Sequence, residues 1–424
     1  MKGDIKMNEK LAAFGKKVLA VLLSVLIPVL AAVISFDPLA KYDPEVKSAL
    51  EKTDGLIKGV CHADPDYDLL HEAGIEWTRK DIPFLYDHEG NISQSYLNWK
   101  AEMQAYADNG IKIFAITPYP YKFLEYGIDP RTPEGKLKVQ ETAKYYVEDL
   151  KDIVGVFQVT NEMGIDRFTK PLTIDEAADY IACQLEVMDP LCEKYDILLG
   201  YNIANIELPF KMLKYNDYLD YIGLDLYLGC FEDILHEIDT FVALAGLVHL
   251  ITQKPIIYCE FGYMGYGEPK TPEEKIKVLQ KYGYNSEAEA TADMNNFIQK
   301  LPEDMKEEIL ELYPDYTAEQ YADIIFRGEY MNHFYTSLPE GYYLDGYTHT
   351  PMGQAKFFED LIPKLLSKDY IIGTVIYCWS DSDACYVCGQ SDCPVETGWG
   401  LVDGEGNRKP SFYAVKEIFN KTDR

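Results

Sequence analysis

Apolar runs and amphipathic stretches alternate along the chain after residue 50. Continuous apolar runs are typical of strands that are buried on both faces, and they cover residues 55–63, 75–84, 111–120, 153–162, 196–204, 218–229, 254–263 and 371–381. Segments with helical spacing follow them, among them 96–110, 173–188, 230–251 and 352–366. Eight strands that alternate with helices predict an α/β fold, a closed (β/α)8 TIM barrel. An open doubly wound sheet is the alternative, but no Gly-rich phosphate loop follows the first predicted strand.

A long region interrupts the pattern between strand seven and its helix. This region, residues 264–349, is acidic and helical, and Thr271, Pro272 and Glu274 have the pattern of a helix start. A similar capping box, Thr173 with Glu176, begins the helix after strand four. Because the insertion leaves the barrel at the carboxyl end of a strand, it is predicted to form a lid or a wall there, with a merely decorative insertion as the alternative.

The first 36 residues differ in composition from the rest. Residues 1–17 carry five lysines against two acids, and the 19 residues from 18 to 36 carry no charge. This pattern predicts a signal peptide, with cleavage after Ser35, or an N-terminal membrane anchor. We therefore expect residues 1–36 to be an export element, 37–54 a lead-in segment and 55–424 the catalytic barrel, working outside the cytoplasm, secreted or attached to the outer face of a membrane.

The net charge of the chain limits the kinds of partner that it is expected to bind. The formal net charge is -30, which would repel nucleic acids, so nucleic-acid binding is not expected. The 34 tyrosines, 18 phenylalanines and four tryptophans offer many flat apolar faces with hydrogen-bonding tips, the mixture that a sugar ring matches.

Three of the nine cysteines lie close together near the C-terminus. Cys385, Cys388 and Cys393 are spaced as a C-x2-C pair with one further cysteine. The spacing fits a disulfide-stabilised loop, free thiols or a zinc site, although no fourth ligand is evident from the sequence.

Two predicted strands end in carboxylates. Asn161 and Glu162 end strand four, and Glu260 ends strand seven. The carboxyl ends of the strands build the active site of a (β/α)8 barrel, and strands four and seven face each other across it. A retaining glycosidase needs two carboxyl groups about 5 to 5.5 Å apart, one as acid/base and one as nucleophile. The two glutamates are therefore candidate catalytic residues.

With these motifs the chain resembles a clan A retaining glycoside hydrolase over about residues 55–420. The resemblance implies that Glu162 is the acid/base, that Glu260 is the nucleophile and that Asn161 hydrogen-bonds the 2-hydroxyl of the reacting sugar. The family within the clan stays open between family 5, family 2-like, family 39-like and an unclassified branch. The histidines that many family 5 members have after strands three and six are absent here.

Three further positions match the clan. By resemblance, Arg79 holds the nucleophile ionised, Tyr227 hydrogen-bonds it and Trp379 floors the subsite beneath the reacting sugar. Weaker candidates for substrate contacts are Glu207, Tyr263, Tyr266, Tyr330, His333, Tyr335 and His349.

The sequence therefore predicts a retaining β-glycoside hydrolase that acts on carbohydrate without a cofactor or a metal. A catalytically silent carbohydrate-binding barrel is the first alternative, although a decayed site usually loses one of its carboxylates or their partners. A metal-dependent hydrolase is the second, but it would need histidines at strand ends, and only His62 lies near one.

Overall fold

The computed structural model describes residues 43–205, 207–232 and 235–422. Eight parallel strands follow one another around a closed barrel, and β8 pairs with β1. The strands are β1 Ile57–Cys61, β2 Trp77–Asp81, β3 Lys112–Ile116, β4 Val154–Gln158, β5 Leu198–Ile203, β6 Tyr221–Leu226, β7 Ile256–Phe261 and β8 Ile371–Ile376. The predicted (β/α)8 barrel is confirmed, and closure of the sheet excludes the open alternative.

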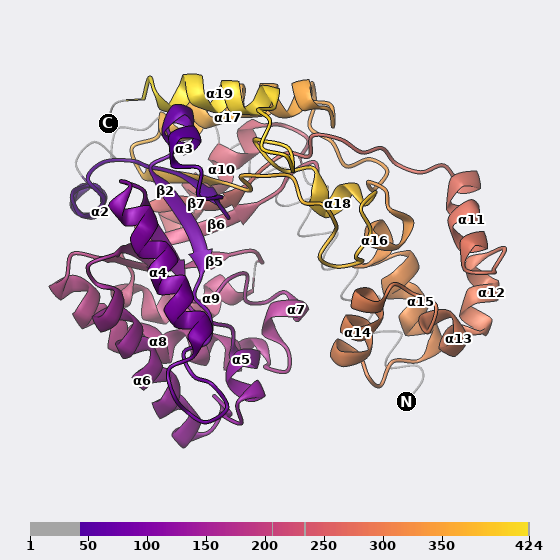
Figure 1. The fold of residues 1–424 in the computed structure, drawn as a ribbon, viewed down its shortest axis with the longest axis horizontal. Coiled ribbons are helices and arrows are strands. Elements are labelled where there is room, and N and C mark those ends of the chain that lie inside the picture. The colour runs from indigo at the N-terminus through magenta and orange to yellow at the C-terminus, as the bar shows by residue number, and fades with distance from the viewer. Residues whose placement is uncertain (1–42, 206, 233–234, 423–424) are drawn as a thin grey trace.

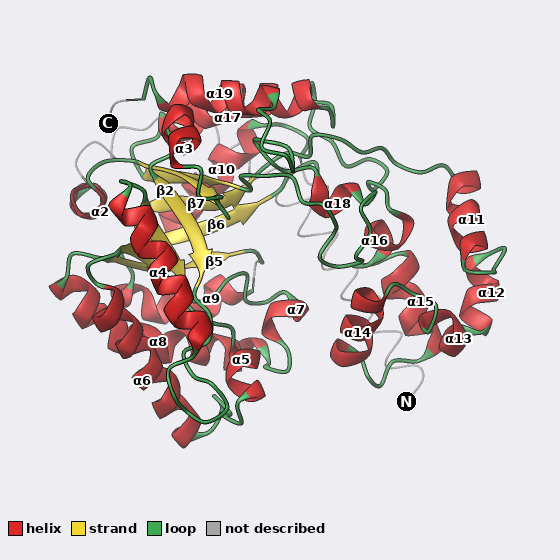
Figure 2. Ribbon diagram, viewed as in Figure 1, coloured by secondary structure: helices red, strands yellow, loops and turns green. Residues whose placement is uncertain are grey.

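Helices surround the barrel on its outside (Figure 2). Those between the strands or at the ends of the barrel are α2 Pro44–Thr53, α3 Tyr67–Ala73, α4 Gln94–Asp108, α5 Pro120–Glu125, α6 Pro133–Leu150, α7 Asp166–Thr169, α8 Ile174–Lys194, α9 Leu208–Met212, the 3-10 helix η2 Leu213–Tyr218, α10 Asp239–Thr252, α17 Pro351–Leu366, α18 Pro394–Thr397 and α19 Pro410–Phe419.

The sequence features that predicted these elements have clear physical counterparts. Every residue of β7 and β8 is buried, which explains their continuous apolar runs. The capping box of Thr173 and Glu176 begins α8 as predicted. The predicted helix over 230–251 is too long at its start, because α10 begins only at Asp239. Near the predicted start, the Glu232 side chain instead accepts the backbone N–H of Tyr227 at 3.0 Å.

Between β7 and α17 the chain forms a separate helical lobe (Figure 1). Its helices are α11 Pro272–Lys281, α12 Glu287–Ala292, α13 Met294–Ile298, α14 Glu303–Leu312, α15 Ala318–Phe326 and α16 Met331–Tyr335. A second hydrophobic core fills this lobe, apart from the core of the barrel. The second core also contains residues of the β8–α19 connection, including Val387 and Val395. The lobe is therefore built from two segments that are distant in sequence.

The first described helix, α2, lies against β4, β5 and β8. Lys52, near the end of this helix, pairs with Asp220 at 3.1 Å. The export element predicted for residues 1–36 lies outside the described residues, so it stays a prediction. Within the described part of the chain, no helix has the length and apolar character needed to cross a membrane.

Candidate active site

A buried arginine at the carboxyl end of the barrel organises the site. Arg79, in β2, is only 1% exposed. Its Nη1 donates to Glu260 Oε1 at 2.5 Å, and its Nη2 donates to Asn161 Oδ1 at 2.6 Å. Its Nε and Nη2 also donate to Gln158 Oε1 at 3.2 and 3.0 Å. One guanidinium thus holds side chains from β7, from β4 and from the turn after β4 in one network.

Glu260 is held from both sides. Besides Arg79, the Tyr227 hydroxyl donates to Glu260 Oε2 at 2.6 Å, and Asn161 Nδ2 approaches Oε1 at 3.4 Å. The strand carrying Glu260 is irregular, since the β6–β7 register shifts just before Asp225 pairs with Glu260. Such irregularities re-aim side chains near active sites. All three partners donate to the carboxylate of Glu260, so its side chain is fixed in one orientation.

Glu162 comes from a turn rather than from a strand. β4 ends at Gln158, and the backbone then passes through the left-handed region at Thr160 (φ 60°) and Glu162 (φ 46°). Residues other than glycine are uncommon there, and such backbones occur often at functional sites. Asn202 of β5 supports the turn, because its Oδ1 accepts the backbone N–H of Glu162 at 3.0 Å.

The two glutamates lie close together. A carboxylate oxygen from each of Glu162, Asp225 and Glu260 lies within 4.8 Å of the others. Burial, followed by the negative charges of Glu260 and Asp225, raises the pKa of Glu162 well above its ordinary range. One carboxyl group therefore favours its proton while the other is held by a cation and a hydroxyl. This is the pattern by which two carboxyls acquire acid and base roles.

Asn202 and Asp225 are part of the network although the sequence analysis gave them no role. Asn202 Nδ2 donates to Asn161 Oδ1 and to Asp225 Oδ2, both at 2.5 Å. Asn202 is buried at 2% exposure in an otherwise apolar strand, and that buried amide was the available signal. Burial and the charge of Glu260 raise the pKa of Asp225 well above its ordinary range.

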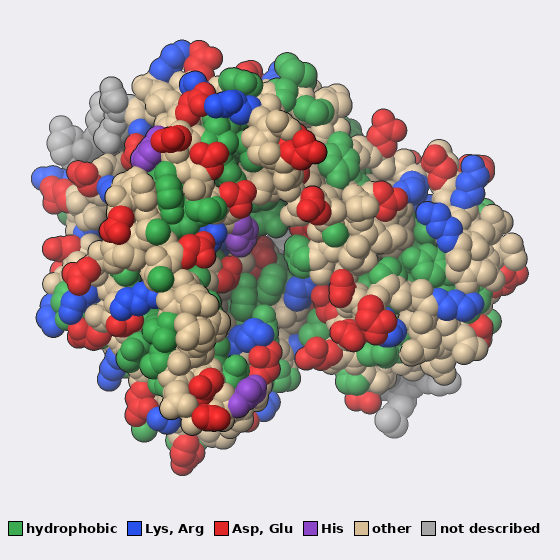
Figure 3. Space-filling view, in the orientation of Figure 1, with side chains coloured by type: hydrophobic (Ala, Val, Ile, Leu, Met, Phe, Trp, Pro, Cys, Tyr) green, Lys and Arg blue, Asp and Glu red, His purple; other side chains and the backbone are tan. Residues whose placement is uncertain are grey.

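Asn161, Glu162, Asp225, Tyr227 and Glu260 line a cleft of about 440 Å³ at the carboxyl end of the barrel. Figure 3 shows the molecular surface hollowed between the barrel and the helical lobe. The insertion forms part of the cleft wall, since Glu329 and His333 line it. Its aromatic lining consists of Tyr119, Phe168, Tyr227, Phe231, Tyr377 and Tyr386. Tyr119 and Phe168 stack at 5.2 Å between ring centres.

Of the predicted site residues, Arg79 and Trp379 do not line the cleft, and of these two only Arg79 contacts residues that do. Trp379 is 1% exposed, lies against Phe412 of α19 and does not line the cavity. β8 ends at Ile376, and the next residue, Tyr377, turns its ring into the cleft. Tyr377 is therefore the aromatic residue that this connection brings to the cleft, because the chain has left the barrel mouth by Trp379.

The weaker candidates for substrate contacts also divide into residues that line the cleft and residues that do not. His333 lines the cleft, whereas Glu207, Tyr263, Tyr266, Tyr330, Tyr335 and His349 do not. Tyr330 donates to Glu308 at 2.7 Å within the lobe, and Tyr263 stacks on His349 with ring centres 4.7 Å apart. Glu232 and Glu396 were missed: both line the cleft, and burial raises their pKa values to about 7 and about 8.

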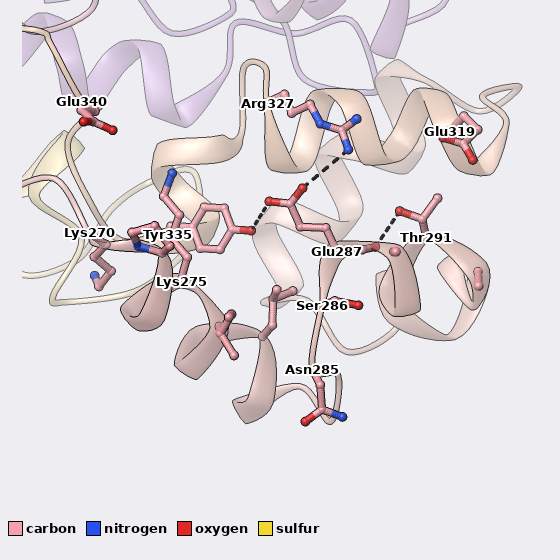
Figure 4. Close-up of a pocket in the computed structure, with 15 residues that line it drawn as sticks. Lys270, Lys275, Asn285, Ser286, Glu287, Thr291, Glu319, Arg327, Tyr335 and Glu340 are labelled. Carbon is pink, nitrogen blue, oxygen red and sulfur yellow. Dashed lines mark hydrogen bonds and ion pairs between the residues drawn. The ribbon is translucent and has the colours of Figure 1, made fainter.

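A second hollow, of about 710 Å³, lies within the insertion (Figure 4). Glu287 reaches its centre from α12, accepts a hydrogen bond from the Tyr335 hydroxyl at 2.8 Å and pairs with Arg327 at 3.5 Å. Lys270 at its rim is bound to Thr336. Since Glu287 and Arg327 pair with each other and Lys270 is bound to Thr336, the smaller cleft at the barrel mouth is the better candidate for chemistry.

Comparison with known proteins identifies the class of fold. No protein-family profile matches the chain, and no curated protein matches its sequence. A family 2 β-galacturonidase from Eisenbergiella tayi with galacturonate bound matches at a TM-score of 0.50 and 12% identity, over 87% of this chain and 52% of that one. A family 39 glycoside hydrolase from the gut symbiont Bacteroides cellulosilyticus matches at 0.52 and 14% identity, over 87% and 64%. The chain thus has the barrel fold found in these glycosidases and spans about half of the first and under two thirds of the second.

Replacing Glu162 tests its raised pKa without any substrate. Between the unfolded pKa of about 4.3 and the raised folded value, the folded state binds more protons, so wild-type stability falls as the pH rises. Glu162→Gln removes this penalty. The variant should gain stability over wild type between pH 5 and pH 8, by about 1.4 kcal/mol for each unit of pKa elevation that the pH range spans. Urea unfolding at both pH values measures the difference, and an identical difference at both would contradict the assignment.

Proposed function

We propose that this protein is a retaining β-glycoside hydrolase. The observation that carries the proposal is the pairing of Glu162 with Glu260: one carboxylate oxygen of each lies within 4.8 Å of the other, the pKa of Glu162 is raised, and Glu260 is bound by Arg79. Retaining enzymes need their two carboxyl groups only about 5 to 5.5 Å apart, whereas inverting enzymes need more room for a water molecule. The barrel fold shared with known glycosidases supports the same class.

The mechanism follows from the two environments. Glu260 attacks the anomeric carbon, because the hydrogen bonds from Arg79 and Tyr227 hold its carboxylate in place. Glu162 gives its proton to the leaving oxygen, and the bond to the leaving group breaks as the bond to Glu260 forms. Once Glu260 is esterified its charge is gone, so Glu162 loses its proton more readily and activates the water that releases the sugar. Two inversions preserve the β configuration.

Two alternatives fit the site less well. A divalent cation among Glu162, Asp225 and Glu260 would compete with Arg79, which already contacts Glu260 at 2.5 Å and lies 4.0 Å from Asp225. A silent binding barrel would not need the raised pKa of Glu162 beside an arginine-held carboxylate. The raised pKa of Glu162 and the buried pairing of Arg79 with Glu260 both cost folding stability, and both are useful for acid/base chemistry.

The cleft also favours one class of sugar. Its described lining contains seven acids: Asp81, Glu162, Asp225, Glu232, Glu260, Glu329 and Glu396. Arg167 also lines it, but its guanidinium is bound to Glu308 at 2.8 Å and to the Tyr386 hydroxyl at 3.1 Å. A substrate carboxylate would therefore meet several carboxyl groups and no uncommitted lysine or arginine among the described lining residues. We propose a neutral β-glycoside as the substrate.

Variants of Glu162 and Glu260 test which glutamate is the acid/base and which is the nucleophile. Glu260→Ala should lose activity on every substrate, by about 10⁴-fold or more, because no nucleophile remains. Glu162→Ala should retain the first step on aryl glycosides whose leaving group needs no proton, and added azide should accelerate its turnover. A 2-deoxy-2-fluoro glycoside should label Glu260, as located by peptide mass spectrometry. A label on Glu162, or an α anomer as the first product, would refute the mechanism.

The carboxyl-rich lining of the cleft, with Arg167 already committed to Glu308, predicts discrimination at C6 of the sugar. Matched aryl β-glucoside and β-glucuronide, and the corresponding β-galactoside and β-galacturonide, differ only in a hydroxymethyl or a carboxylate group. A like charge about 6 Å away costs about 3 kcal/mol at an effective dielectric constant of 20, so kcat/KM should be roughly 100-fold lower for the uronides. Equal or better uronide turnover would show that Arg167 recognises the carboxylate and that the proposed substrate class is wrong.

The aromatic floor is tested by a pair of variants. Tyr377→Ala should lower kcat/KM by about tenfold, mainly through KM, because one stacking contact contributes about 0.5 to 1.5 kcal/mol. Trp379→Ala should instead lower the free energy of unfolding by about 3 to 5 kcal/mol, with little change in kcat/KM per folded molecule. Steady-state kinetics and denaturant unfolding of both variants give the comparison. The reverse pattern would restore Trp379 as the floor.

A further inference from the structure

Four metal-binding side chains meet in the helical lobe. Cys385, Cys388 and Cys393 of the β8–α19 connection converge on His333 of α16, and one ligand atom from each lies within 4.8 Å of all the others. His333 is 6% exposed, and none of the three cysteines exceeds 1%. The sequence left the fourth ligand unidentified because His333 precedes the first of these cysteines by 52 residues. In the folded chain, His333 is this fourth ligand.

The geometry fits a tetrahedral ion. His333 Nδ1 lies 3.4 Å from Cys385 Sγ and 3.9 Å from Cys393 Sγ. Zn–S bonds of about 2.3 Å and Zn–N bonds of about 2.0 to 2.1 Å place these ligand atoms about 3.6 Å apart around a tetrahedral ion. All nine cysteines of the chain are free, so the loop contains no disulfide. The three sulfurs are gathered around one imidazole nitrogen rather than joined in a pair.

The backbone turn between the first two cysteines is also suited to a metal. Gly389, directly after Cys388, has φ 66°, a region that favours glycine, and its N–H donates to the Cys385 carbonyl at 2.7 Å. This tight turn brings both thiols to the same side of the loop. Cys393 lies at the start of α18 and closes the group from the other end.

We propose that His333, Cys385, Cys388 and Cys393 bind a structural Zn²⁺ ion. The four protein ligands fill a tetrahedral shell, and their burial excludes an exchangeable position, so the ion has no direct catalytic part. Its role is to fasten the insertion to the β8–α19 connection, the two segments that share the second core. The proposal stands independently of the glycosidase assignment.

The site has a consequence for the cleft. His333 lines the cleft directly, Tyr386 lines it between two of the cysteines, and Glu396 lines it three residues after Cys393. Figure 1 shows α18 and α16 side by side between the barrel and the rest of the lobe, in agreement with the shared core. A bound ion would therefore hold one wall of the cleft in place.

Metal analysis of the purified full chain tests the proposal. Wild type should contain about one zinc per chain, and Cys388→Ser should lose most of it. Cys183→Ser is the matched control, since Cys183 is also buried but lies in α8, outside the cluster, and this variant should keep its zinc. Cobalt reconstitution should give the visible bands of a tetrahedral site with thiolate charge transfer.

If Cys388→Ser does not fold, measurements on the wild-type protein alone still test the proposed zinc site. Prolonged treatment with a strong chelator should lower the Tm, and zinc but not magnesium should restore it. A metal-free, folded wild type whose Tm does not respond to zinc would overturn the proposal. So would iron in place of zinc, zinc retained in a folded Cys388→Ser, or a disulfide among the three cysteines found by mass spectrometry.

Discussion

The cleft end of the barrel depends on the burial of one cation. Arg79 is 1% exposed, and a guanidinium so far from water is tolerated only when its charge and its N–H groups are all matched. Glu260 supplies the charge, and Gln158 and Asn161 supply the acceptors. The requirement couples β2, β4 and β7, so the side chains on three strands have one mutually satisfied arrangement.

The same network gives two neighbouring glutamates different surroundings. Glu260 takes the cation and the Tyr227 hydroxyl, and Glu162, close by, is left with burial and like charge. The strained turn at Glu162 and the raised pKa both cost folding free energy, and Asn202 compensates in part by holding the turn. Costs of this kind are typical of sites that are built for reaction rather than for stability.

The wall of the cleft that faces the barrel mouth is built by other segments of the chain, the insertion and the β8–α19 connection. The insertion has its own hydrophobic core, and the β8–α19 connection crosses over to complete that core. Through this crossing, Tyr386 and Glu396 reach the cleft from one segment while Glu329 and His333 reach it from another. The cleft therefore joins a rigid barrel mouth, which carries the proposed chemistry, to a helical lobe whose position affects the shape of the binding space.

Local patterns in the sequence determined the barrel and much of its active end. Continuous apolar runs report burial on both faces of a strand, and eight such runs leave few other folds. Polar residues after such runs are expected at strand ends, which is how Asn161, Glu162 and Glu260 became candidates. Arg79 and Tyr227, on or directly after strands, became candidates through the resemblance to the clan.

Only the tertiary structure decided where side chains beyond the strand ends lie. Three residues after β8 the chain has turned, so Tyr377 rather than Trp379 faces the cleft. Asn202 gains its role from partners on other strands, and His333 joins three cysteines that begin 52 residues later. The physical reason is that periodicity records whether a residue is buried, whereas its partners depend on register, on turns and on which loops share a core, and these are set by contacts between segments far apart in the sequence.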